Sequence, residues 1–240
     1  MSEENKSYIA GIYNYCDRWC EKCTFTSNCL LFTNESKIVA QEILKPGESI
    51  DIEKIFDMNF DNEENEGNLP GEISGEQDEE IKEDNTEINK YPLSILADNF
   101  FSKSMAIIKK MDERYNFFAQ SGKKEPGSAF SRLFEDFEIF AWFNPLIVAK
   151  LKRAVSSKLE MRVDDDEDML NIREYDMNGS AKISIIALEK TVKALNKLFD
   201  RMPEFKNEIT ELLILSGELL NLTEEEFPGF NGFIRPGFDE

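Results

Sequence analysis

The residues of this chain whose types and spacing could do chemistry are its four cysteines. They fall within fourteen residues, and the rest of the 240-residue chain has none: Cys16, Cys20, Cys23 and Cys29. The spacing is C-x3-C-x2-C-x5-C, which supplies enough thiolates to close a four-ligand metal site. A chain that used cysteine only as a small apolar filler would scatter it, so the clustering predicts a metal centre.

Other interpretations of the cysteines stay open. Cys16, Cys20 and Cys23 stand at i, i+4 and i+7, so in a helix they would share one face, with Cys29 returning to them after a turn. The same spacing suits core-facing residues, and free cysteine packs well. Two disulfides would suit an oxidising compartment, and Cys20 with Cys23 has the C-x-x-C arrangement of thiol redox pairs.

The neighbours of the cysteines suit an inorganic centre. Arg18 and Lys22 would offset the negative charge of four thiolates, and backbone amides in the turn would hydrogen-bond the sulfurs. Four aromatic residues are near enough in sequence to shield the centre from water: Tyr13, Trp19, Phe25 and Phe32.

The kind of metal is suggested by a local resemblance. Structural zinc sites commonly pair two C-x2–4-C units across a longer spacer, and this cluster is more compact. The sub-pattern Cys20-x2-Cys23-x5-Cys29 resembles the iron–sulfur loop of endonuclease-III type DNA glycosylases, which implies a 4Fe–4S cluster. The catalytic helix-hairpin-helix region of those enzymes has no counterpart here, so their activity is not implied. We expect a 4Fe–4S cluster as cofactor, with zinc as the alternative.

Two further resemblances add no activity. The first three cysteines are similar to the C-x3-C-x2-C of radical-SAM enzymes, but those need an α/β barrel, and Lys22 takes the usual place of an aromatic residue. Four segments resemble a group of bacterial helical proteins to which we can attach no mechanism: Tyr15-Cys-Asp-Arg-Trp-Cys-Glu-Lys-Cys23, Trp142 with Lys150-Leu-Lys-Arg-Ala154, Asn178-Gly-Ser-Ala-Lys182 and Arg235-Pro-Gly-Phe-Asp239.

Charge argues against nucleic acid as a partner. The formal net charge is −20, and residues 57–88 hold thirteen Asp and Glu against one Lys. A negative field repels phosphate backbones, so binding would need a local basic patch. The best candidate for such a patch is interpreted more simply as a solvated helix face. It consists of Lys150, Lys152, Arg153, Lys158 and Arg162.

The sequence gives no reason to expect a membrane partner. The first residues lack a secretory signal, and the longest apolar stretches are too short to span a bilayer. We therefore expect a cytoplasmic location, where a reducing environment favours a metal over disulfides.

Hydrophobic periodicity predicts an all-α protein, an antiparallel bundle of about four long helices. The expected helices run from Pro92 to about Gln120, from Ser128 to Leu159 with a kink or break at Asn144-Pro145, from Ala181 to Met202, and from Glu204 to Leu222. The connection before the third helix is expected at Asp164–Asp168 and Asp176–Gly179.

Four regions follow along the chain. We expect residues 1–58 to form a metal-binding unit with a helix Glu35–Leu44 capped by Asn34, residues 59–90 an acidic, disordered linker, and residues 91–222 the bundle. Residues 223–240 form the tail; from Phe227 onward its Pro and Gly forbid regular helix, and its phenylalanines are costly to leave in water. We expect this tail to run extended across the bundle, with partner binding as the alternative.

Residue types exclude several kinds of enzyme. The chain has no histidine, which removes Ser–His–Asp and Cys–His machinery and His-ligated zinc hydrolysis. Glu135 and Glu138 could in principle bind a metal, but a solvated face is the simpler interpretation. The leading hypothesis is a non-catalytic protein with a structural or redox-sensing centre that acts through another protein. A zinc-stapled interaction module and an iron–sulfur enzyme of unknown substrate are the alternatives.

Overall fold

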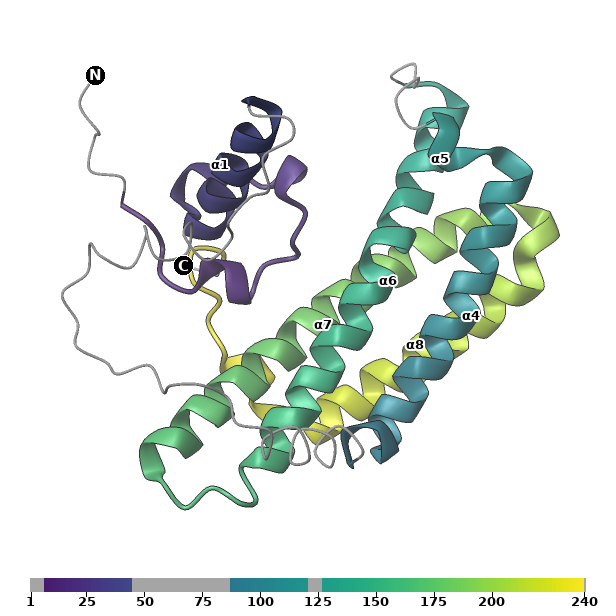
Figure 1. Ribbon diagram of the computed structural model, residues 1–240. Helices are drawn as coiled ribbons and strands as arrows, with labels where there is room; N and C mark the ends of the chain where they lie inside the picture. Colours follow the sequence, from purple (N-terminus) through teal and green to yellow (C-terminus); the bar gives the residue numbers. More distant parts are fainter. Residues whose placement is uncertain (1–6, 45–86, 121–126, 240) are drawn as a thin grey trace. The chain divides into compact units, whose positions relative to one another are not determined.

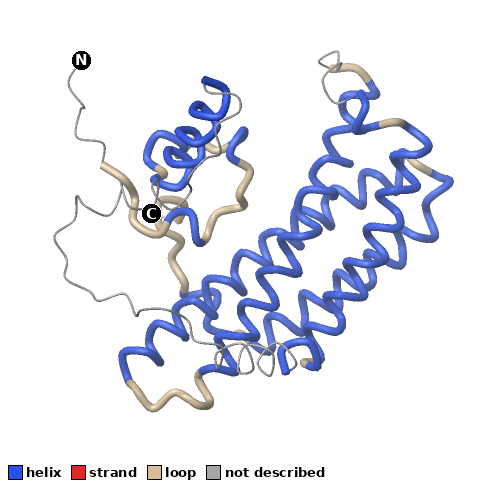
Figure 2. The backbone as a smooth tube through the Cα atoms, in the orientation of Figure 1, coloured by secondary structure: helices blue, strands red, loops and turns tan. Residues whose placement is uncertain are grey.

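The computed structural model describes residues 7–44, 87–120 and 127–239. Within those ranges the chain forms α-helices, 3-10 turns and loops, and no strand (Figure 2). The all-α prediction is therefore confirmed. The chain divides into two compact units, Met1–Gln77 with Ile234–Glu240 and Asp78–Phe233, which we call the cysteine unit and the helical unit.

Four long helices make up most of the helical unit (Figure 1). Helix α6 packs on α7 along much of its length, α4 packs on α6, and α8 packs on both α7 and α4. A buried carboxylate helps to hold α6 on α7, because Asp136 accepts hydrogen bonds from Lys197 and Arg201. The four helices are α4 (Pro92–Tyr115), α6 (Ala129–Glu160), α7 (Glu167–Arg201) and α8 (Lys206–Glu226).

The expected count of about four helices is too low for the described residues as a whole. Helix α1 (Leu30–Leu44) and the short α5 (Phe117–Gln120) add to the four long ones. The predicted first helix to Gln120 is divided because Asn116 adopts a left-handed conformation with φ of 59°, which asparagine tolerates better than most residues.

Capping side chains fix two of the helix starts. The Ser128 hydroxyl accepts the Ser131 N–H at 3.0 Å, and an Asp166 carboxylate oxygen accepts the Asp168 N–H at 2.9 Å. Pro92 stands in the first turn of α4, as predicted.

Two breaks that the sequence suggested within helices do not occur. Helix α6 continues through Pro145, which lies on its exposed side, where water can replace the missing amide hydrogen bond. Helix α7 continues through Asp176–Gly179, so the connection is confined to residues 161–166. Glycine costs about 1 kcal/mol inside a helix, and the buried packing of Gly179 offsets that cost.

The end of the chain departs from the predicted tail. Helix α8 extends to Glu226, and a 3-10 helix, η6 (Pro228–Gly232), follows it. Phe227, Phe230 and Phe233 are buried, as the cost of exposing them predicted. Residues 234–239, however, belong to the cysteine unit rather than to the helical unit.

Two expectations about the first half of the chain have different outcomes. The predicted cap at Asn34 is wrong, because α1 begins at Leu30, where the Cys29 carbonyl accepts the Thr33 N–H at 3.1 Å. Most of the predicted acidic linker lies outside the described residues.

None of the helices in the described part of the chain is long and apolar enough to cross a membrane.

A hydrogen-bonded cluster joins α8 to α4 and α6 and predicts a pH effect. The Glu226 carboxylate accepts from the Tyr91 hydroxyl at 2.7 Å and from the Lys158 ammonium. The hydrogen bond from Lys158, followed by the one from Tyr91, lowers the pKa of Glu226. A carboxyl whose pKa is lower in the folded state adds stability above its unfolded pKa of about 4.3, and this is lost as the pH falls through the folded pKa.

We therefore expect Glu226→Gln to flatten the loss of stability in acid. The Glu226 side chain is about a third exposed, so solvent screening keeps the effect below about 1 kcal/mol. The measurement is the free energy of unfolding between neutral pH and pH about 3. Glu225→Gln, one residue earlier and exposed, is the matched control. Identical acid slopes in the two variants would contradict this role for Glu226.

Candidate metal centre

The backbone around the cysteines is a series of tight turns rather than the predicted helix. Three 3-10 turns fall here: η1 (Ile12–Asn14), η2 (Cys20–Lys22) and η3 (Thr26–Asn28). Between the first two, Arg18 has a φ of 58°, which no right-handed helix allows. An Asp17 carboxylate oxygen accepts the Trp19 N–H at 3.2 Å and supports this bend. The prediction that the first three cysteines share one face of a helix is therefore wrong.

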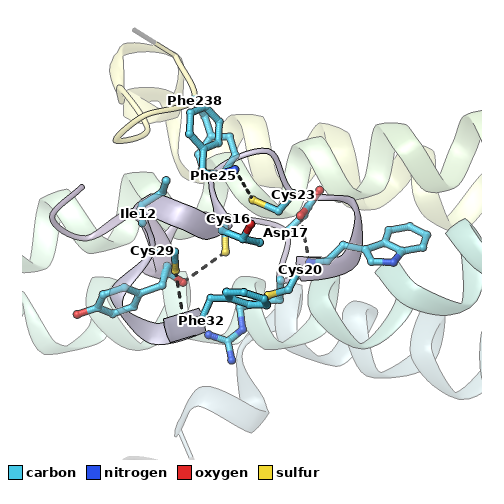
Figure 3. A pocket seen from close by; sticks show the side chains of 13 residues that line it. Ile12, Cys16, Asp17, Cys20, Cys23, Phe25, Cys29, Phe32 and Phe238 are labelled. Atoms are coloured by element: carbon cyan, nitrogen blue, oxygen red, sulfur yellow. Dashed lines mark hydrogen bonds between the residues drawn. The ribbon is translucent and has the colours of Figure 1, made fainter. Parts of the chain in front are cut away.

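The turns nevertheless bring all four cysteines to one place. Cys16, Cys20, Cys23 and Cys29 line the same small, open cavity (Figure 3). All four thiols are free of disulfides. The predicted gathering of these side chains is thus seen, although the backbone that achieves it is not the predicted one.

Aromatic side chains surround the cavity as expected. The four aromatic residues predicted to shield the centre all line the cavity: Tyr13, Trp19, Phe25 and Phe32. Two apolar residues that were not predicted there, Ile12 and Phe238, line it as well. Phe238 comes from the far end of the chain and packs edge-on against Phe25, with ring centroids 5.0 Å apart. The wall of the cavity is therefore largely apolar, which limits the access of water to the sulfurs.

Backbone amides point at two of the sulfurs, as predicted. The Phe25 N–H donates to Cys23 Sγ at 3.4 Å, and the Phe32 N–H donates to Cys29 Sγ at 3.5 Å. The Cys16 thiol instead donates to the Tyr13 carbonyl, at a sulfur–oxygen distance of 3.6 Å. Amide donors of this kind stabilise negative charge on sulfur and are typical surroundings of metal-bound thiolates.

Burial raises the pKa of the Cys16 thiol, and it also raises the pKa of the Cys20 thiol, where the nearby Cys16 adds to the effect. These two thiols are therefore protonated at neutral pH when nothing cationic is bound. A coordinating metal removes the proton outright, because its charge stabilises the thiolate far more than burial disfavours it.

The two predicted cations have different positions. Arg18 lines the cavity, and its Nη2 lies 3.1 Å from Oε1 of Glu35 on α1. Lys22 does not line the cavity, and its Nζ lies over the Trp19 ring at 3.5 Å from the centroid. Arg18 is thus the cation placed to offset charge on the thiolates.

Local hydrogen bonds hold the cysteine unit together. The Ile9 N–H donates to the Asn28 carbonyl at 3.0 Å, and the Asn28 side-chain amide donates to the Ser7 carbonyl at 3.0 Å. Among its described residues, Ile12, Tyr15 and Trp19 are buried hydrophobic ones, each less than a tenth exposed. They lie beside the cysteines in the sequence, so the turns that carry the cysteines are packed on this core.

No group of three or more Cys, Asp, Glu or His side chains among the described residues is close enough, as it stands, to hold a metal ion. Metal binding by the four cysteines therefore remains a prediction.

The helical unit has a second, open pocket lined mainly by polar residues of α6 and α7. Its cations are already engaged, because Arg153 pairs with Asp176 at 2.8 Å and Lys152 with Asp98 at 2.9 Å. Lys158 is likewise paired with Glu226. The predicted basic patch therefore has the character of a solvated, ion-paired helix face, as its simpler interpretation proposed.

Comparison with known proteins adds no relative. No family model, no curated protein and no solved structure matches this chain. The functional argument therefore depends on the chemistry of the cysteine unit.

Proposed function

We propose that this protein holds an iron–sulfur cluster of the 4Fe–4S type on Cys16, Cys20, Cys23 and Cys29, in a structural or redox-sensing role. The observation that carries the proposal is that all four cysteines of the chain line one cavity with an apolar wall. Four cysteine thiolates are the usual ligands of such a cluster.

The spacing of the cysteines in the sequence supports a cluster over a single zinc ion. Zinc draws its four ligand atoms to about 2.3 Å from one point. A four-iron cluster instead takes one thiolate at each of four separate iron atoms, so its ligand sulfurs enclose a larger volume. The compact C-x3-C-x2-C-x5-C spacing, in which Cys20-x2-Cys23-x5-Cys29 resembles the iron–sulfur loop of endonuclease-III type glycosylases, favours the second arrangement.

The chain's own residues would set the properties of the cluster. The amides of Phe25 and Phe32 donate to Cys23 and Cys29, and such hydrogen bonds raise the reduction potential by stabilising the more negative state. The aromatic wall excludes water, which protects the cluster from loss and oxidation. When bound, the cluster would supply a one-electron redox couple and a covalent link between the turns that carry the four cysteines.

A sensing or structural role fits the surroundings better than catalysis. The lining of the cavity has hydrophobic, aromatic and cysteine side chains with one carboxylate, one guanidinium and one aliphatic hydroxyl, those of Asp17, Arg18 and Thr26. The chain also lacks histidine, the commonest acid–base group of enzymes. A partner protein that responds to the state of the cluster remains part of the proposal.

Purification without oxygen tests the proposal. We expect brown protein with about four iron atoms and as many acid-labile sulfides per chain. A colourless protein with one tightly bound zinc would overturn the iron–sulfur assignment and support the zinc-stapled module. A protein without metal above trace amounts would overturn both.

A further inference from the structure

We propose that the C-terminal segment Arg235–Asp239 is a wall of the metal centre, so that occupation of the centre and docking of this segment favour one another. The inference rests on the proposed function and adds to it a means of regulation. The segment belongs to the same compact unit as the cysteines.

The contact that carries the inference is made by Phe238. Its side chain lines the cysteine cavity, and its ring packs edge-on against the ring of Phe25 at 5.0 Å (Figure 3). Phe25 also donates its backbone N–H to the sulfur of Cys23. Phe238 therefore rests on the residue whose amide holds one of the ligand sulfurs, and its removal would open the cavity at that sulfur.

Internal hydrogen bonds hold the segment in a turn that presents Phe238. The Arg235 guanidinium donates to Asp239 Oδ1 from Nη2 at 2.7 Å and from Nε at 3.0 Å. The Arg235 N–H also donates to Asp239 Oδ2 at 3.0 Å, and the Phe238 N–H donates to the Arg235 carbonyl at 3.1 Å. Because the turn is already organised, docking orders fewer residues and costs less conformational entropy.

Gly237 fits this docked arrangement in a way that other residues do not. Its φ is 74°, in the left-handed region, and a Cβ atom there would lie 3.0 Å from Cδ1 of Ile9 and 3.1 Å from Cδ1 of Ile12. Ile12 is itself in the wall of the cavity. The backbone of the segment thus approaches the cysteine unit closely on one side of Phe238.

The segment is covalently continuous with the helical unit. Phe233, just before it, is buried there, and its carbonyl accepts a hydrogen bond from Lys182 at 2.5 Å. If docking of residues 235–239 strengthens cluster binding, cluster binding strengthens docking by the same factor. Loss of the cluster would therefore favour release of residues 235–239 from the cysteine unit.

The test compares Phe238→Ala and a chain ending at Ile234 with wild-type protein and with Ile234→Ala, a change at an exposed residue of the same tail. All are loaded with iron and sulfide without oxygen, and the loss of visible absorption to an iron chelator is timed. We expect several-fold faster loss in Phe238→Ala and in the truncated chain, and an unchanged rate in Ile234→Ala.

Hydrogen exchange supplies the reciprocal measurement. The amides of Phe238 and Asp239 should exchange several-fold faster in iron-free wild-type protein than in loaded protein. Equal chelation rates in all loaded variants, with equal exchange at these amides, would overturn the inference while leaving the cluster in place. Wild-type protein that takes up no iron would instead overturn the proposed function on which the inference rests.

Discussion

Cys23→Ser is expected to abolish the iron centre and to unfold the cysteine unit. Serine is too poor a ligand to replace the thiolate, and the other three sulfurs would be left without a complete site. Among the described residues of this unit, Ile12, Tyr15 and Trp19 are the buried hydrophobic ones. A metal that binds the folded unit but not the unfolded one adds its binding free energy to the stability of the unit, so loss of the metal should destabilise it strongly.

The measurement uses a tryptophan within the unit. The chain has two tryptophans, so a Trp142→Phe background leaves the buried Trp19 as the reporter of the cysteine unit. In that background Cys23→Ser should contain little iron and show the fluorescence of an exposed indole. Thr24→Ser, at the exposed neighbouring residue, is the control and should behave like the parent. Unchanged iron content in Cys23→Ser, or an unchanged Trp19 signal, would contradict this prediction.

Phe137→Ala is expected to cost the helical unit about 3–5 kcal/mol in free energy of unfolding. Phe137 on α6 is fully buried, and its ring stacks on that of Phe117 with centroids 4.2 Å apart. The rings of Phe134 and Phe118 also pack against it, so truncation leaves a cavity lined by rigid side chains that close poorly over it.

Denaturation followed by helical circular dichroism measures the effect. The control is Ile214→Ala, which removes an aliphatic side chain that is 59% exposed on α8 and should change stability by less than about 0.5 kcal/mol. A loss of under about 1 kcal/mol in Phe137→Ala would show that this aromatic cluster contributes little to the stability of the helical unit.

The long helices could be predicted from the sequence because their apolar residues repeat with the helical period over many turns. Their interruptions could not be predicted equally well. Gly179 and Pro145 indicated helix breaks. Gly179 is nevertheless tolerated in α7, where it is buried, and Pro145 is tolerated in α6, where it is exposed to water. No break was predicted at Asn116, yet this residue ends α4 in a left-handed conformation.

The candidate site was predictable in composition but not in backbone. Clustered cysteines with neighbouring aromatics indicated a shielded site, and these residues do line one cavity. The helix proposed for Cys16–Cys23 failed because the left-handed Arg18 and short-range hydrogen bonds favour turns. Phe238 was expected to pack on the bundle with the rest of the tail, but it packs on Phe25. This contact was missed because no local sequence pattern indicates a contact between opposite ends of the chain.

X-ray absorption spectroscopy on protein purified without oxygen tests the central claim most directly, because it reports the atoms bound to the metal. We predict an iron edge with sulfur as the only kind of ligand and a second iron as a near neighbour. Iron bound by oxygen or nitrogen, a zinc edge with four sulfurs at about 2.3 Å, or no metal at all would contradict a 4Fe–4S cluster on Cys16, Cys20, Cys23 and Cys29.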